Sequence, residues 1–305
     1  MQDGDRFFIF GLGYSALAFA RRPEMGRLLR AGTVRGAPKA ARLHAEGIEA
    51  LLFDGMTDHP AIRAALAETT HLLVSIAPDR AGDPVLRVFG EAIAAAPGLA
   101  WIGYLSTVGV YGDHGGAWID EATTPRPVSA RSVNRLAAEA AWTALGAHRG
   151  VPVALLRLSG IYGPGRNPFV NLADGSARRL VKPGQVFNRI HVADIAAVIA
   201  AAAARRASGV FNVTDDEPAP PQDVVAFAAD LAGYPPLPGI PFEAADLSPM
   251  ARSFYGENKR VSNRRLAELG VKLRYPDYRT ALTALWQSGD WRAEEGAARA
   301  PIGGG

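Results

Sequence analysis

Short segments that are apolar at every position alternate with longer segments of helical composition through the first half of this 305-residue chain, and this alternation restricts the fold most. A strand without polar positions must be covered on both faces, as strands of parallel sheets are. Parallel neighbours need crossover connections, which helices provide. The predicted fold class is therefore α/β, with a doubly wound parallel sheet and helices on both of its faces.

The apolar segments that predict strands are residues 7–10, 50–53, 72–76, 101–105 and 153–158. The segments that predict helices between them are residues 38–46, 60–68, 83–96 and 132–148. A short further strand is predicted to end near Arg35. A strand and a helix follow within residues 189–205, and residues 210–213 predict a last strand.

The composition excludes several classes of protein. The 33 basic and 30 acidic side chains leave a net charge of +3, and the basic residues are scattered, so nucleic acid is not an expected partner. The absence of cysteine excludes disulfides, thiolate metal ligands and a cysteine nucleophile. No spacing between the six histidines and the carboxylates predicts a metal site.

An apolar stretch at residues 7–20 resembles a secretory signal only superficially. The residues before it carry Asp3 and Asp5 against Arg6, whereas a secretory signal begins with positive charge. Its 14 residues are also too few for a helix that spans a bilayer. We therefore expect a cytoplasmic protein without a membrane partner.

The strongest local motif follows the first predicted strand. Gly11, Gly13 and Ala16 form G-x-G-x-x-A, with Tyr14 and Ser15 as expected cofactor-binding residues within it, and a helical segment follows at residues 17–20. In a dinucleotide-binding loop the first glycine permits a tight turn, the second lets the backbone approach a pyrophosphate, and the small third residue lets the helix pack closely. The free amides at the start of the helix favour an anion. The motif predicts dinucleotide binding, and a purely structural turn is the alternative.

The residues after this loop favour NADP over NAD. An NAD site needs an acidic residue about 20 positions further on, but no acidic residue lies between Glu24 and Glu46. Arg35 stands there instead and suits a 2′-phosphate, with Lys39 as a weaker second cation. A solvated role is the alternative for Arg35. Asp54 could contact adenine or cap the next turn.

Four motifs together resemble the short-chain dehydrogenase/reductase superfamily, in its extended and atypical NAD(P)-dependent epimerase/dehydratase branch. They are S-T-V-G-V-Y-G at 106–112, R-x-x-x-I-Y-G-P-G at 157–165, R-I-H-V-A-D at 189–194 and F-N-V-T-D-D-E-P at 211–218. The resemblance implies a Rossmann domain with the cofactor above the carboxyl ends of the strands. It also implies that Ser106 lies beside the nicotinamide and that Ser75 and Ala77 border the cofactor.

The change to glycine- and proline-rich sequence after Leu158 marks the end of the regular alternation. We expect residues 1–160 with 188–213 to form the Rossmann domain. Residues 161–187 with 214–291 are expected to form a smaller C-terminal lobe that contacts substrate, and residues 292–305 to be a disordered tail.

The sequence departs from the family at the catalytic helix. Members of the family carry a tyrosine and a lysine four residues apart, followed by Leu-x-x-Glu. Here L-A-A-E at 136–139 sets the register and places Arg131 and Arg135 at those positions, on one helix face. A guanidinium cannot exchange protons near neutral pH, but it can bind a carboxylate or phosphate. A solvated role for both arginines is the alternative.

The remaining candidates for catalysis are Ser106, which could polarise a substrate oxygen, and Tyr111, which could donate the proton. A packing role for Tyr111 is the alternative, and Tyr162 is a weaker candidate. We expect an NADP-dependent oxidoreductase or an epimerase/dehydratase-like enzyme that acts on a small anionic substrate. The alternative is a non-catalytic protein that senses NADP. The helix at 132–148 has an apolar face, which we expect to pack either on the sheet or against a second copy of the chain in a homodimer. Its residues are Val133, Leu136, Ala137, Ala140, Ala141 and Ala144.

Overall fold

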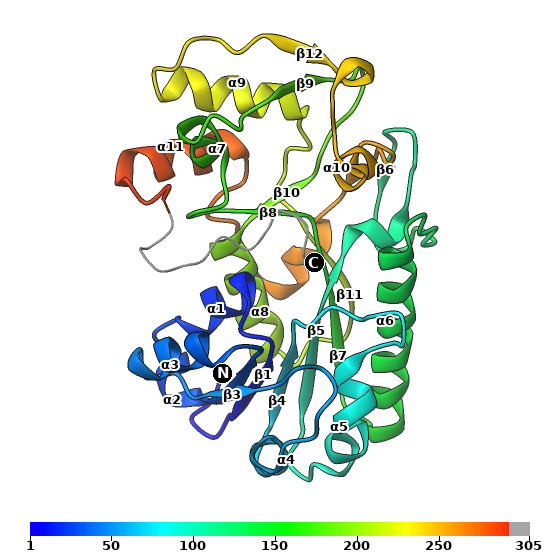
Figure 1. Ribbon diagram of the computed structural model, residues 1–305. Coiled ribbons are helices and arrows are strands. Elements are labelled where there is room, and N and C mark those ends of the chain that lie inside the picture. The colour runs from blue at the N-terminus through cyan, green and yellow to red at the C-terminus, as the bar shows by residue number, and fades with distance from the viewer. Residues whose placement is uncertain (293–305) are drawn as a thin grey trace.

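The computed structural model describes residues 1–292, and a seven-stranded parallel sheet lies at its centre (Figure 1). The strands follow the order β11-β7-β5-β4-β1-β2-β3, and every neighbouring pair is parallel. The strands are β1 (Phe7–Phe10), β2 (Leu29–Val34), β3 (Ala50–Leu52), β4 (His71–Val74), β5 (Trp101–Thr107), β7 (Val153–Leu158) and β11 (Gly209–Val213). The predicted α/β fold class is confirmed.

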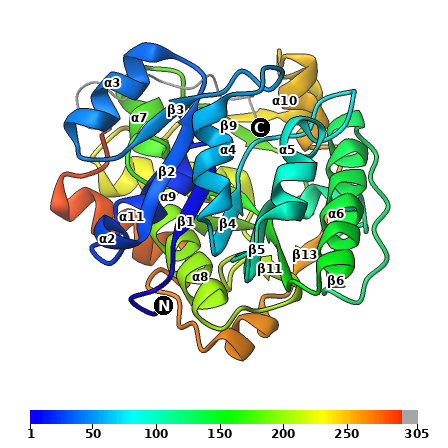
Figure 2. The same cartoon turned by 90° about the horizontal axis from the view of Figure 1, so that it is seen from below.

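Helices cover both faces of this sheet, as the uninterrupted apolar strands require (Figure 2). The helices on one face are α1 (Tyr14–Ala20), α2 (Met25–Leu28), α3 (Ala37–Ala45) and α8 (Val192–Ala204). The helices on the other face are α4 (Pro60–Ala67), α5 (Pro84–Ala95) and α6 (Ala130–Arg149). In β1, Phe7 and Ile9 join the first core while Phe8 and Phe10 join the second, so no position of this strand faces water.

The element boundaries differ by a few residues from those predicted. β4 ends at Val74 rather than at residue 76, and β5 continues two residues further, to Thr107. α6 begins at Ala130 because Ser129 caps it, with its side chain accepting a hydrogen bond from the backbone N–H of Ser132.

A smaller group of elements lies above the carboxyl ends of the strands (Figure 1). It contains α7 (Pro168–Ala173), β9 (Arg179–Val181), α9 (Pro221–Leu231), β12 (Gly239–Pro241), α10 (Pro249–Phe254) and α11 (Tyr278–Ser288). Helices α7, α9 and α11 share a core of their own, which includes Phe169, Ala228 and Leu282. We call this group the upper lobe.

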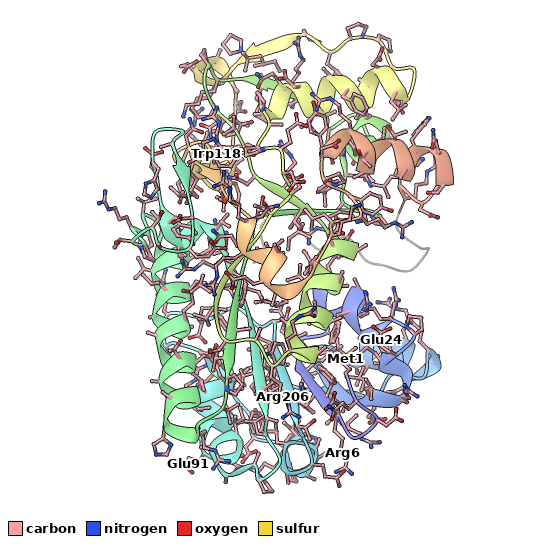
Figure 3. All side chains as sticks on the ribbon, turned by 180° about the vertical axis from the view of Figure 1, so that it is seen from behind. Met1, Arg6, Glu24, Glu91, Trp118 and Arg206 are labelled. Carbon is pink, nitrogen blue, oxygen red and sulfur yellow. The ribbon has the colours of Figure 1, made fainter. Side chains whose placement is uncertain are left out.

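Two short parallel pairs connect the upper lobe to the sheet region. One pairs β8 (Gly160–Tyr162) with β10 (Arg189–His191), and the other pairs β6 (Trp118–Ile119) with β13 (Arg260–Val261). Segments of two or three residues carry no recognisable period, so the sequence does not predict these pairings. Figure 3 shows Trp118 toward the upper lobe and Glu91 near the opposite end of the molecule.

Within the described residues, no helix combines the length and the apolar character that crossing a lipid bilayer would require. The tail predicted at residues 292–305 falls, except for Arg292, outside the part of the chain that the structure describes.

Candidate functional site

The glycine loop connects the end of β1 to α1 at the carboxyl edge of the sheet. Gly11 has a φ of +89°, which side chains other than hydrogen rarely tolerate, and a Cβ there would lie 2.8 Å from Cγ1 of Ile76. The Gly11 N–H donates to Oγ1 of Thr33 at 2.9 Å, and the Ser75 N–H donates to the carbonyl of Phe10 at 2.8 Å. The structure thus brings Ser75 beside the glycine loop, because β1 and β4 are neighbours.

The surroundings of Gly13 fit an approaching ligand. A Cβ built on Gly13 would meet no atom within 4 Å, so the space in front of this backbone is open. Gly13 precedes α1 and supplies no side-chain cap, and no acidic residue lies in the first turn of the helix. Ala16, in contrast, is completely buried in the core. These three features suit a phosphate bound to backbone amides, with close helix packing behind it.

The two cations expected near the loop lie at different depths. The Lys39 ammonium donates to the carbonyl of Leu12 at 2.6 Å. Burial lowers the pKa of Lys39, and the charges of Arg42, Arg21 and Arg35 lower it further. Arg35 is exposed directly after β2, and no carboxylate within residues 1–292 pairs with it.

Asp54 has a local role in the structure. Its carboxylate accepts hydrogen bonds from the backbone N–H groups of Met56 and Thr57, both at 2.8 Å, and these bonds lower its pKa. Asp54 therefore caps the turn after β3, which was one of its two expected roles. Ala77 is exposed beyond the end of β4. Contact of either residue with a cofactor stays a prediction.

Ser106 belongs to a buried network beneath α6. Its hydroxyl donates to Oε1 of Glu139, and the guanidinium of Arg157 donates to both carboxylate oxygens of Glu139, at 3.1 and 2.6 Å. All three residues are at most 4% exposed. Ser106 thus faces the interior, so its expected position beside a nicotinamide would require its hydroxyl to leave Glu139.

Tyr111 is completely buried in the same region. Its hydroxyl donates to Oδ1 of Asn212 at 2.8 Å, and the Arg157 guanidinium carbon lies 4.7 Å from the centroid of its ring. In this arrangement Tyr111 packs and does not present a proton, because its O–H is turned away from the surface. A role as proton donor would require its release from Asn212.

Thr107 is a candidate that the sequence reasoning missed. It is the last residue of β5, it is half-buried, and its Oγ1 accepts a hydrogen bond from the Gly109 N–H at 3.1 Å. Because side chains alternate along a strand, Thr107 points to the opposite side from Ser106. Ligands of open α/β sheets bind at this carboxyl edge. The sequence feature that could have identified Thr107 is its position as a second hydroxyl-bearing residue immediately after Ser106.

The two arginines of α6 contact different parts of the molecule. Arg135 donates to the carbonyl of Leu105 at 2.8 Å and lies 5.7 Å from the ring of Tyr104. Arg131 is exposed, and its guanidinium carbon lies 5.7 Å from the ring of Phe254 in α10. No carboxylate of the described residues pairs with Arg131. Arg135 is therefore held by the sheet, while Arg131 extends toward the upper lobe.

A second group of buried polar residues lies where β8 and β10 meet the upper lobe. The carboxylate of Asp215 is buried, and neither of its oxygens has a hydrogen-bond partner among the described residues. Burial raises the pKa of Asp215 to about 8, although the nearby charge of Arg189 opposes the shift. The hydroxyl of Tyr162 and Nε2 of His191 are also buried, and neither has a hydrogen-bond partner within residues 1–292. Sequence reasoning missed Asp215, because its burial depends on elements that are distant along the chain.

His191, which caps α8, and Asp194, in the first turn of that helix, both accept hydrogen bonds from backbone N–H groups. Nδ1 of His191 accepts a hydrogen bond from the Ala193 N–H, and Asp194 accepts bonds from the backbone of Arg274 and Tyr275 at 2.7 and 3.0 Å. Both side chains therefore serve the structure. No cluster of metal-ligating side chains occurs within residues 1–292.

Comparison with known proteins finds a family model and solved structures that resemble this chain. A model of the NAD dependent epimerase/dehydratase family matches residues 86–214. The solved structure of a conserved protein of unknown function from Silicibacter pomeroyi is 49% identical, covers 94% of this chain and 99% of its own, and has a TM-score of 0.83. A candidate NAD-dependent epimerase/dehydratase from Methylobacillus flagellatus is 27% identical, with coverages of 93% and 98% and a TM-score of 0.69.

More distant structures share the fold alone. The dTDP-glucose 4,6-dehydratase of Bacillus anthracis, solved in complex with NAD, is 15% identical and has a TM-score of 0.73 over 94% of this chain and 98% of its own. No curated protein sequence matches this chain.

Proposed function

We propose that this chain, which belongs to the NAD-dependent epimerase/dehydratase family, binds NADP(H) at the glycine loop. The proposed activity is that of an oxidoreductase or an epimerase/dehydratase-like enzyme that acts on a small anionic substrate. The observation that carries the proposal is the open backbone at Gly13, beside the cationic side chains of Arg35 and Lys39. A pyrophosphate against this backbone would leave the adenosine ribose on the side of β2, where Arg35 stands.

Electrostatics supports the choice of NADP. An NAD site binds the ribose hydroxyls with a carboxylate, but residues 25–45 contain none. The guanidinium of Arg35 has the planar donor fork that suits a 2′-phosphate. The distant relative solved with NAD shares only the fold with this chain, so the proposal rests on this chain's own cations.

The proposed chemistry divides the work among residues at the carboxyl edge. Bound NADP(H) would supply or accept a hydride. We assign to Thr107, rather than to Ser106, the hydroxyl that donates a hydrogen bond to a substrate oxygen, because the Ser106 hydroxyl already donates to Glu139. Arg131 is the proposed anion-binding residue, since it is exposed and lacks a carboxylate partner among the described residues. Arg135 would position β5 through the carbonyl of Leu105.

A non-catalytic NADP sensor is the second candidate function. The observation that favours it is the lack of an exchangeable proton on Arg131 and Arg135, combined with the burial of Tyr111. Single-turnover mixing with NADPH and a panel of carbonyl compounds separates the two. Oxidation of NADPH with any anionic carbonyl compound favours the enzyme. Tight binding without oxidation favours the sensor when the protein purifies without nucleotide, because an epimerase/dehydratase-like enzyme would return the hydride to its substrate and keep its cofactor bound.

Cofactor preference is tested by calorimetric titration of Arg35→Ala with NADPH and NADH. We expect the affinity for NADPH to fall by roughly tenfold to a hundredfold, which corresponds to the loss of one charge-assisted contact, and the affinity for NADH to stay unchanged. Arg6→Ala is the control, because Arg6 is an exposed arginine just before β1, at the opposite end of the strand from the loop (Figure 3). An undiminished preference for NADPH in Arg35→Ala would disprove the role of Arg35.

A homodimer and a cytoplasmic location remain predictions. One face of α6 packs on the sheet through Ala138 and Trp142. Val133, Ala137, Ala140 and Ala144 form a second apolar face, which is exposed. An exposed apolar helix face of this kind supports self-association.

A further inference from the structure

A tight turn of the chain after β8 touches the glycine loop from above. Gly163 and Arg166 are joined by two backbone hydrogen bonds of 3.0 Å, which close the turn. The hydroxyl of Tyr14, the first residue of α1, donates to the carbonyl of Pro164 at 2.9 Å. A Cβ on Gly163 would lie only 2.7 Å from that hydroxyl, so glycine is needed for this approach. We call residues 163–166 the upper turn.

Arg166 is the charged residue of the upper turn, and its side chain is available for a ligand. Its guanidinium carbon lies 5.1 Å from the centroid of the Tyr14 ring. The residue is exposed, and within residues 1–292 its guanidinium has neither a carboxylate partner nor a hydrogen bond. A cation thus stands beside the residue that follows Gly13, where the backbone is open.

The upper turn is held in place from its other side. The Asn167 side-chain amide donates to the carbonyls of Gly163 and Trp291 at 2.8 and 2.7 Å, while its oxygen accepts bonds from the first N–H groups of α7. The Gly165 N–H also donates to the carbonyl of Trp291 at 3.0 Å. A residue on a backbone fixed in this way loses little freedom when it binds a ligand.

We infer that Arg166 is a cofactor-binding residue whose guanidinium binds the pyrophosphate of the dinucleotide. The inference rests on the proposed function, because it needs a dinucleotide at the glycine loop. A guanidinium binds phosphate oxygens through paired N–H donors, and an arginine stacked on Tyr14 is already oriented for this contact. The sheet domain and the turn after β8 would then hold the cofactor between them.

Calorimetric titrations of Arg166→Ala with three ligands test the inference. NADPH and NADH both contain a pyrophosphate, whereas adenosine 2′-monophosphate contains only a phosphate on the 2′-oxygen and none at the 5′ position. We expect the affinities for NADPH and NADH to fall by the same factor, roughly tenfold or more, while the affinity for adenosine 2′-monophosphate changes less than about twofold. Arg166→Lys should retain part of the affinity, and Arg6→Ala should bind as the wild type does.

The results separate this inference from the proposed function. If wild-type protein binds NADPH and a folded Arg166→Ala binds it equally well, the inference fails alone. If Arg166→Ala loses affinity for adenosine 2′-monophosphate as much as for NADPH, Arg166 contacts the adenosine half and the pyrophosphate assignment is overturned. If the wild-type protein binds neither dinucleotide, the proposed function fails and the inference with it. Circular dichroism confirms that the variants are folded, and Arg166→Gln replaces any Ala variant that is not.

Discussion

At the scale of single residues, Asp215 shows how tertiary surroundings change the chemistry of a side chain. The carboxyl group is 1% exposed and has no hydrogen-bond partner among the described residues. Burial raises its pKa to about 8, although the Arg189 charge opposes the rise and Asp216 and Glu217 add to it. The group is therefore mostly protonated at neutral pH, whereas an aspartate in the unfolded chain is ionised.

Asp215→Asn should remove a pH dependence of stability. Because the folded state holds a proton that the unfolded state releases, the free energy of unfolding should fall as pH rises from about 4 to 8, by at most about 1.4 kcal/mol per unit. Asn cannot ionise, so the variant should be the more stable protein above pH 8. Urea denaturation between pH 5 and 9 measures this difference.

His191 provides an internal check on that experiment. Burial lowers the pKa of His191 to about 4, and the charge of Arg274 lowers it further. Stability from this residue is present above about pH 6.5 and is lost as pH falls toward 4, which is the opposite slope. Of these two groups, only Asp215 changes its protonation state between pH 7 and 8. If the free energy of unfolding depends on pH in the same way for wild type and Asp215→Asn in this window, the raised pKa of Asp215 is contradicted.

At the scale of elements, one carboxylate joins α6 to two strands of the sheet. Glu139 of α6 accepts hydrogen bonds from Ser106 at the end of β5 and from Arg157 in β7. Arg157 also lies over the ring of Tyr111, whose hydroxyl reaches Asn212 in β11. This buried network holds the helix that carries Arg131 and Arg135 in register with the carboxyl edge of the sheet.

Glu139→Ala should destabilise the protein strongly, because it leaves the buried Arg157 guanidinium without its partner. Removal of one member of a buried ion pair costs about 3–5 kcal/mol. Glu91→Ala is the matched control, since Glu91 is an exposed glutamate on the neighbouring helix α5 (Figure 3), and its effect should stay within about 0.5 kcal/mol. Chemical denaturation measures both, and equal losses of stability would show that the network contributes nothing specific.

At the scale of the whole molecule, the chain passes between the sheet and the upper lobe several times. Residues 160–191 leave the sheet region and return through β10, and β11 then completes the central sheet. The upper turn touches α1 on one side, through Pro164, and Trp291 on the other, through Gly165. Sheet and lobe are therefore linked by backbone as well as by side-chain contacts, and we expect them to unfold together.

Saturating NADPH should stabilise both parts of the molecule in one transition. A ligand present at 100 times its dissociation constant stabilises the folded state by about 2.7 kcal/mol. Calorimetric melting should show a single transition that moves to higher temperature with NADPH and moves less in Arg35→Ala. Two transitions, of which only one responds to NADPH, would contradict this expectation.

The sequence by itself determined the features that depend on neighbours along the chain. Fully apolar strands, helical spacing and the glycine loop are local patterns, and they predicted the α/β fold and most of the elements correctly. The replacement of the family's tyrosine and lysine by Arg131 and Arg135 was also visible, because the residues after them set the register.

Only the tertiary structure decided which polar groups face the carboxyl edge of the sheet and which are buried. Ser106 meets Glu139, Tyr111 meets Asn212, and Arg166 meets Tyr14, and each pair joins residues that are far apart in the sequence. The direction of a hydroxyl and the pKa of a buried acid depend on such partners, because the electrostatic and hydrogen-bond energies involved act through space and not along the backbone.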